Sequence, residues 1–182
     1  MNDKPIVPYW HLWTDADGVS RQSRCAMTEF EMKSMQPPAD PQWQGRKMHG
    51  AMSMMITVQP IGWTGAWHEN PKPQWIVPLS GRWFVESMDG TRVEMGPGEF
   101  SFGGDQHCVE HDGRKGHTSG TVGDAAAVLM VIQFDAVPLD AIPLDANLLD
   151  VNPLDPTRFD MTRSGATQSD DAAAPASPCV FR

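Results

Sequence analysis

GWTGAWHENPKPQWIVPLSG, the sequence of residues 62–81, decides how this chain is expected to fold. Prolines stiffen its middle, and its apolar end breaks at a Ser-Gly pair, as a strand does on entering a turn. His68, Asn70 and Gln74 stand at short intervals within it. Three interpretations are open: a metal site, the remnant of one, or a proline-stiffened loop between two strands.

Residues 1–134, which surround this stretch, predict an all-β domain. Apolar and polar side chains alternate in AMSMMITV, and the side chains that share one face there are Met52, Met54, Ile56 and Val58. VLMVIQF, residues 128–134, is typical of a buried strand. Turn signals rich in Gly separate such segments, and no amphipathic helix of convincing length is present. The sequence therefore predicts a sandwich or barrel with the methionines of residues 52–54 in its core.

The composition changes near residue 135, and residues 135–182 form a second, unlike part. An Asp recurs at every fifth position from Asp135 to Asp160, in units such as AVPLD and AIPLD. A period of five matches neither helix nor strand, and the prolines remove backbone donors. We expect an irregular C-terminal tail: an extended pentad repeat, laid along the domain by its leucines, and a disordered end.

Charge and hydropathy exclude several classes of protein. The chain has 14 basic and 23 acidic residues, a net charge of −9, which argues against a nucleic-acid-binding surface. No apolar run approaches the length of a transmembrane helix, and the N-terminus lacks the features of a signal peptide. We therefore expect a cytoplasmic protein with neither a nucleic acid nor a membrane as its partner.

The three cysteines, Cys25, Cys108 and Cys179, are odd in number and widely spaced. They form no CxxC pair, so the sequence predicts neither a disulfide framework nor a zinc–thiolate site. Each is expected to be a small buried hydrophobic residue or an idle surface thiol.

The spacing of residues 62–81 resembles the first motif of the cupin superfamily. That motif runs G, five residues, H-x-H, three or four residues, E, six residues, G, and Gly62, His68 and Gly81 stand at the matching positions. Two side chains depart from it, because Asn70 replaces the second His and Gln74 replaces the Glu. The resemblance implies a double-stranded β-helix, the cupin jelly-roll barrel, over residues 8–134.

The second cupin motif opens with a Gly after Pro and closes on a His. Gly98 fits the opening, and three residues compete for the closing position: His107, His111 and His117. The segment GRKGHTSGTVGD is similar to the ending of a group of small bacterial single-domain cupins, which favours His117. Residues 9–18 and 62–68 are similar to two further signatures of that group.

The resemblance also implies a site inside the barrel. A divalent transition metal, Mn, Fe, Ni or Zn, would be held by His68, Gln74 and His117, with His107 or His111 as alternatives to His117. Without a metal, His68 or His117 could move a proton next to a carbonyl group. The residues expected to bind the substrate are Asn70, Gln74, Trp67 and His11.

The expected function is that of a small-molecule cupin enzyme, a lyase, isomerase or oxygenase, acting on a compound with a carbonyl or carboxylate group. The alternative is a binding module that retains the barrel but has a degenerate metal site. A third reading makes the domain mainly an oligomerisation unit. In each case we expect a homodimer.

Overall fold

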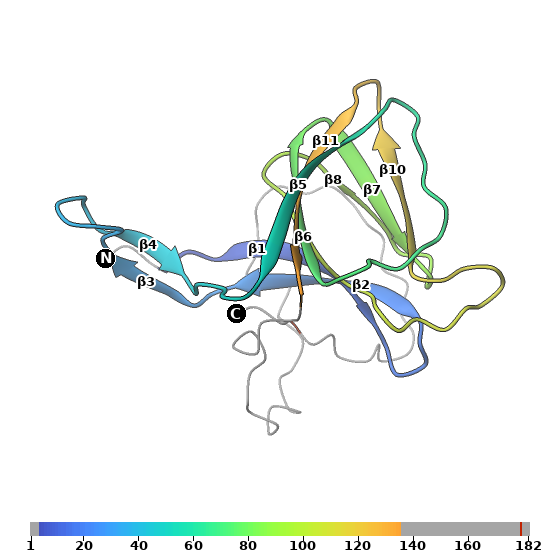
Figure 1. Cartoon of the computed structure of the whole chain (residues 1–182), viewed down its shortest axis with the longest axis horizontal. Helices are drawn as coiled ribbons and strands as arrows, with labels where there is room; N and C mark the ends of the chain where they lie inside the picture. Colours follow the sequence, from blue (N-terminus) through green and yellow to red (C-terminus); the bar gives the residue numbers. More distant parts are fainter. Residues whose placement is uncertain (1–3, 136–178, 180–182) are drawn as a thin grey trace, which may run out of the picture.

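The computed structural model describes residues 4–135 and residue 179, and all regular structure within them is β-strand (Figure 1). The prediction of an all-β domain is therefore confirmed. No helical segment in this part of the chain has the length and apolarity that a membrane crossing requires. The strands are β1 (Val7–Thr14), β2 (Ser20–Met27), β3 (Phe30–Lys33), β4 (Gln42–Gly45), β5 (Met52–Gln59), β6 (Gln74–Ser80), β7 (Arg82–Ser87), β8 (Arg92–Met95), β9 (Ser101–Gly104), β10 (His117–Val122) and β11 (Ala127–Phe134).

The strands form three sheets. The largest has the order β2-β1-β9-β6-β11-β5, the second has the order β10-β7-β8, and β3 and β4 form a hairpin. Figure 1 shows this hairpin projecting away from the other two sheets. All strand pairs are antiparallel except β1 and β9, which run parallel.

The two larger sheets pack face to face around one apolar core. Trp83, Val85, Val93 and Met95 come from the three-stranded sheet, and they cluster with residues of the six-stranded sheet such as Leu129. Contact between the inner faces of two sheets is how a β-sandwich buries its alternating apolar side chains. This arrangement leaves the opposite face of the six-stranded sheet outside the sandwich.

A second apolar cluster covers part of that outer face. Tyr9, Trp75, Phe102 and Phe134 belong to it, with Cys25. Trp75 and Ile76 are neighbours on β6, yet Ile76 lies in the inner core, because successive side chains of a strand point to opposite faces. Gln74 therefore shares the inner face with Ile76, and both line the space between the two sheets.

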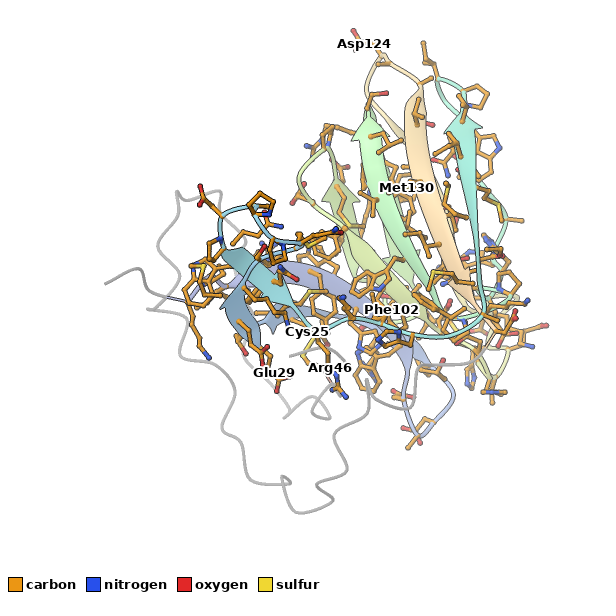
Figure 2. All side chains as sticks on the ribbon, turned by 60° about the vertical axis from the view of Figure 1, so that its left-hand side comes forward. Cys25, Glu29, Arg46, Phe102, Asp124 and Met130 are labelled. Atoms are coloured by element: carbon orange, nitrogen blue, oxygen red, sulfur yellow. A yellow bond between two sulfur atoms is a disulfide. The ribbon has the colours of Figure 1, made fainter. Side chains whose placement is uncertain are left out.

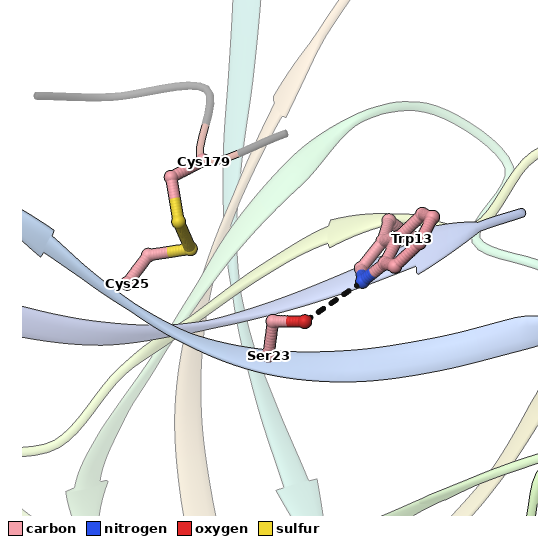
Figure 3. Close-up of a disulfide and its surroundings, with 4 residues drawn as sticks. All are labelled: Trp13, Ser23, Cys25 and Cys179. Atoms are coloured by element: carbon pink, nitrogen blue, oxygen red, sulfur yellow. Dashed lines mark hydrogen bonds between the residues drawn. A yellow bond between two sulfur atoms is a disulfide. The ribbon is translucent and has the colours of Figure 1, made fainter. Parts of the chain in front are cut away.

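Cys25 and Cys179 form a disulfide, so the expectation that the thiols are unpaired is wrong for these two residues (Figure 3). Their sequence separation of 154 exceeds any spacing that sequence motifs recognise. The pairing follows from the fold, because Cys179 packs against the outer-face cluster to which Cys25 belongs. The part of the C-terminal end that includes Cys179 is thereby attached to β2. Cys108 is a free, buried cysteine, as predicted.

The methionines of β5 are not in the core. Met52, Met54, Ile56 and Val58 share one face, but all four are exposed, because β5 is the edge strand of the six-stranded sheet and this face points outward. Alternation in the sequence shows which side chains share a face and says nothing about whether that face is covered. The pentad repeat of residues 136–178 lies outside the described residues.

Candidate functional site

A cavity of about 350 Å³ lies between the two main sheets. Four residues predicted for the site line it: His68, Asn70, Gln74 and His117. Apolar side chains make up much of the remaining wall, and they include Met55, Trp63, Ile76, Trp83, Leu129 and Val131. The sequence analysis therefore identified residues that the structure brings together.

Backbone pairing holds the two histidines side by side. His68 and His117 form an isolated antiparallel bridge, in which each N–H donates to the other residue's carbonyl oxygen, at 2.9 and 2.8 Å. Their ring centroids lie 4.5 Å apart. Gly116 permits this approach, because a Cβ at this position would lie 2.2 Å from the carbonyl oxygen of His68.

His117 is oriented by a buried carboxylate. The side chain of His117 is 3% exposed, and its Nδ1 lies 2.7 Å from Oδ2 of Asp105, which is fully buried. An ionised carboxylate can only accept hydrogen bonds, so Nδ1 carries the proton and Nε2 is left for a ligand. The pair has the geometry of an imidazole whose tautomer is fixed by an acid.

A chain of side-chain amides supports the carboxylate. Oδ1 of Asp105 accepts hydrogen bonds from the backbone N–H and the side-chain Nδ2 of Asn70, at 3.1 and 2.6 Å. Nε2 of Gln74 donates to Oδ1 of Asn70, and Nε2 of Gln133 donates to Oε1 of Gln74 at 2.8 Å. Gly103 leaves the room for Asn70, because a Cβ there would lie 2.3 Å from Nδ2 of Asn70. The amides thus form one continuous network with Asp105.

His68 stands at the more open side of the cavity. Its ring is exposed, and its Nδ1 lies 2.8 Å from the carbonyl oxygen of Ala66. A carbonyl oxygen only accepts, so this contact also places the proton on Nδ1. The Nε2 atoms of His68 and His117 are consequently the nitrogens that remain for a ligand.

The donor set does not fit the metal site expected from the resemblance. No group of three or more His, Cys, Asp or Glu side chains within residues 4–135 is placed to hold a metal ion. Gln74 has its amide oxygen engaged by Gln133, and Asp105 has its oxygens engaged by His117 and Asn70. Two imidazoles fall short of the three protein ligands typical of a catalytic metal site.

The alternative ligands and two predicted substrate residues do not line the cavity. His107 and His111 are exposed on the loop between β9 and β10. Trp67 is half-buried, with the guanidinium of Arg114 5.2 Å from its ring centroid. His11 alternates with Leu12 on β1 and packs on the outer face, 5.5 Å from the ring of Phe102.

Two residues of the site were missed from the sequence. Asp105 lies in a Gly-rich stretch that motif spacing treats as a turn and an insertion. Its signal was the Gly103–Gly104 pair before it, since adjacent glycines permit a close approach of side chains. Gln133 had a clearer signal, as the polar residue within the apolar run VLMVIQF, because a polar side chain in a buried strand needs a partner.

The loop between β9 and β10 is tied to the site segment. Glu69 accepts a hydrogen bond from the backbone N–H of Cys108 at 2.7 Å and pairs with Lys115 at 2.9 Å. The hydrogen bond and charge of Glu69 raise the pKa of Lys115. Burial raises the pKa of the Cys108 thiol, so this thiol stays protonated near neutral pH and is no nucleophile.

The charge of the cavity wall limits what it can bind. Neither Lys nor Arg is among the residues that line it, so an anionic substrate would find no counter-ion. A larger groove of about 620 Å³ lies beside the β3–β4 hairpin, where Lys4, Lys33, Arg46 and Lys47 are exposed. Those side chains are solvated and no buried polar group points into the groove, so we place the site in the smaller cavity.

Neither a protein-family model nor a curated protein sequence matches the chain. The cupin resemblance consequently stays an expectation drawn from motif spacing, and the function is argued from the cavity alone.

Proposed function

We propose that the chain binds a small uncharged carbonyl compound between its two main sheets and transfers a proton on it, as an isomerase or lyase does. One observation carries the proposal: the buried His117–Asp105 pair at the wall of an apolar cavity. A histidine oriented by a carboxylate is the usual general base of proteins near neutral pH.

In the proposed reaction, Nε2 of His117 removes a proton from the carbon next to the carbonyl group. The electron pair of the broken C–H bond moves onto the carbonyl oxygen, and the carboxylate of Asp105 stabilises the imidazolium that forms. The electron pair then returns from the oxygen to re-form the C=O bond. In a β,γ-unsaturated substrate the double bond shifts into conjugation and the imidazolium gives its proton to the γ-carbon; in a β-substituted substrate the bond to the leaving group breaks and the leaving group takes the proton. Atoms and charge balance in both outcomes without a further reactant.

The developing charge on the oxygen requires hydrogen-bond donors. Gln133 donates to Gln74 with one N–H, and its amide has a second N–H at the cavity wall. His68 is not a second donor in its neutral form, because its Nδ1 proton is directed to the carbonyl oxygen of Ala66 and its Nε2 is an acceptor. Apolar side chains form much of the cavity wall, and their low polarity strengthens the hydrogen bond that Gln133 would donate.

A specific observation favours a second candidate, a binding module without catalysis. Amides stand at residues 70 and 74, where the cupin motif has a His and a Glu, and both amides are occupied within the network. Such a cavity could hold a ligand through Nε2 of His117 without reacting with it.

The test is solvent-deuterium exchange at the carbon next to the carbonyl, followed by NMR over a panel of small ketones and aldehydes. We expect exchange with the wild-type chain and a loss of about 10²–10⁴-fold in His117→Gln, the range of general-base catalysis. His107→Gln, on the exposed loop, is the matched control and should exchange at the wild-type rate.

Saturable binding of a panel member without exchange would support the binding module instead. Unchanged exchange in His117→Gln would contradict the proposed role of His117.

A further inference from the structure

The outer side of β5, β11 and β6 presents an apolar surface that is left exposed within residues 4–135. Directly paired residues of an antiparallel sheet share a face, and Ile56 is paired with Met130 on β11, which is paired with Val77 on β6. Figure 2 shows the three strands side by side, with Met130 on the middle strand. We call this surface the β5 face, and its six main side chains are Met52, Met54, Ile56, Val58, Val77 and Met130.

The adjoining part of the same sheet face is covered, and the C-terminal part of the chain contributes to the cover. Trp75 and Phe134 are buried in the outer-face cluster, and Cys179 packs against that cluster. Phe134 is paired with Met52, so the β5 face begins where the cluster ends. Met54, farther along β5, is 62% exposed, and apolar patches of this kind mark contact surfaces.

Both ends of residues 136–178 are fixed beside the β5 face. At one end, the N–H of Asp135 donates to the carbonyl oxygen of Ala51, the residue before β5, at 3.1 Å. At the other end, the disulfide to Cys25 holds Cys179 at the outer-face cluster. A segment of this length spans at most about 150 Å. β5, with 8 residues, is roughly 27 Å long, so the segment can run along it and return.

The first part of this segment has the composition of a covering segment. Residues 136–155 consist of Ala, Val, Ile, Leu and Pro, with four Asp and two Asn as their only polar residues. Each of the four Asp directly follows a leucine, and these leucines are Leu139, Leu144, Leu149 and Leu154. Contact between the leucines and the β5 face would remove apolar surface of both from water, which is favourable.

We propose that residues 136–155 pack on the β5 face of their own chain, with the leucines toward the sheet and the aspartates toward solvent. A segment tied at both ends faces this surface at an effective concentration of about millimolar, well above that of a second copy at micromolar concentration. None of the six side chains of the β5 face is charged, so the aspartates meet no like charge there. Anionic lipid and nucleic acid, by contrast, are repelled by the net charge of −9.

The experiment is oxidation of the full chain by hydrogen peroxide, with the sulfoxide at each methionine followed by mass spectrometry, because oxidation follows exposure. Met35, in the loop between β3 and β4, is the matched reference, since it is 67% exposed and Met54 is 62% exposed. The two would oxidise at similar rates without a cover. We expect Met54 to oxidise about 10-fold more slowly than Met35, as for a cover that is in place about nine-tenths of the time.

A variant of the segment tests whether its leucines provide this protection. It combines Leu139→Ser, Leu144→Ser, Leu149→Ser and Leu154→Ser, and Met54 should then oxidise as fast as Met35. All four positions lie outside residues 4–135, so the core is unchanged, and circular dichroism should show the same strand content as in the wild-type chain. The control combines Asp140→Asn, Asp145→Asn, Asp150→Asn and Asp155→Asn, which keep the leucines, and should leave Met54 protected.

Three outcomes would overturn the proposal. The first is equal oxidation of Met54 and Met35 in the wild-type chain, because the β5 face would then be uncovered. The second is protection that persists in the leucine variant, because another part of the chain would then be the cover. The third is protection that disappears on dilution over roughly a hundredfold range around micromolar, together with a dimer in sedimentation velocity, because a second copy would then cover the face.

Discussion

His117 shows how one buried hydrogen bond defines the chemistry of a side chain. Its imidazole would be an ordinary buried histidine without Asp105, free to take either tautomer. The carboxylate lies 2.7 Å from Nδ1 and is itself held by two hydrogen bonds from Asn70. The acid therefore cannot turn away without breaking the network, and Nε2 is the nitrogen left for a ligand.

At this scale we predict that Asp105→Asn impairs catalysis more than it impairs folding. An Asn fills the same space, so the Tm should change by only a few degrees. The Asn side chain carries no negative charge that could stabilise the imidazolium of His117. Its amide can also turn an N–H, in place of an acceptor oxygen, toward Nδ1 of His117. We expect the exchange rate to fall by about 10²–10⁴-fold.

The NMR signal of the Nδ1 proton of His117 separates orientation from a general loss of structure. A short hydrogen bond to a carboxylate shifts this proton far downfield, and in Asp105→Asn the signal should move upfield or vanish. Glu94→Gln, which alters an exposed carboxylate paired with Arg92, is the control and should change neither the rate nor the signal. A downfield signal that persists in Asp105→Asn would contradict the orientation by Asp105.

Among the elements, the turn before β10 determines whether the two histidines meet. Gly116 has a φ of 78°, in the left-handed region that favours glycine, and it lies against the backbone of His68. Gly113, on the same loop, has a φ of 76°, and a Cβ there would meet nothing within 4 Å. The two glycines thus share one backbone conformation and differ in their surroundings.

We predict that Gly116→Ala is far more damaging than Gly113→Ala. Both pay about 1–2 kcal/mol for a left-handed alanine. Gly116→Ala must in addition push the His68 backbone away, which breaks the bridge to His117 and should reduce the exchange rate. Thermal melts and exchange rates of both variants give the comparison, and equal effects would show that the bridge is not needed.

How far the sequence predicts these elements depends on whether a property is local. Alternation predicted that Met54 and Ile56 share a face. Motif spacing predicted that His68 and Gln74 belong to one site, and both line the same cavity. Whether a strand face is covered by other parts of the chain is not a local property. β5 lies at the edge of the six-stranded sheet, and no residue of β5 itself indicates that position. Asp105 was missed because its partners, Asn70 and His117, lie 35 and 12 residues away.

For the whole molecule, the Cys25–Cys179 disulfide is the least local feature. It contradicts the sequence-based expectation that these cysteines are unpaired more directly than any other feature does. Disulfides persist mainly in oxidising compartments. The expectation of a cytoplasmic protein therefore stays a prediction, and a redox-controlled measurement of stability bears on it.

We predict that the disulfide stabilises the domain by about 2–5 kcal/mol, because it closes a very long loop in the unfolded chain. Cys179→Ser should lower the free energy of unfolding by that amount, measured by denaturant titration without reductant. Cys179 is preferable to Cys25 for this change, since Cys25 is buried and a serine there would bury a hydroxyl. A reductant should destabilise the wild-type chain to a similar degree and leave Cys179→Ser unchanged. If the variant and the wild-type chain unfold at the same denaturant concentration without reductant, the disulfide contributes nothing to the stability of the domain.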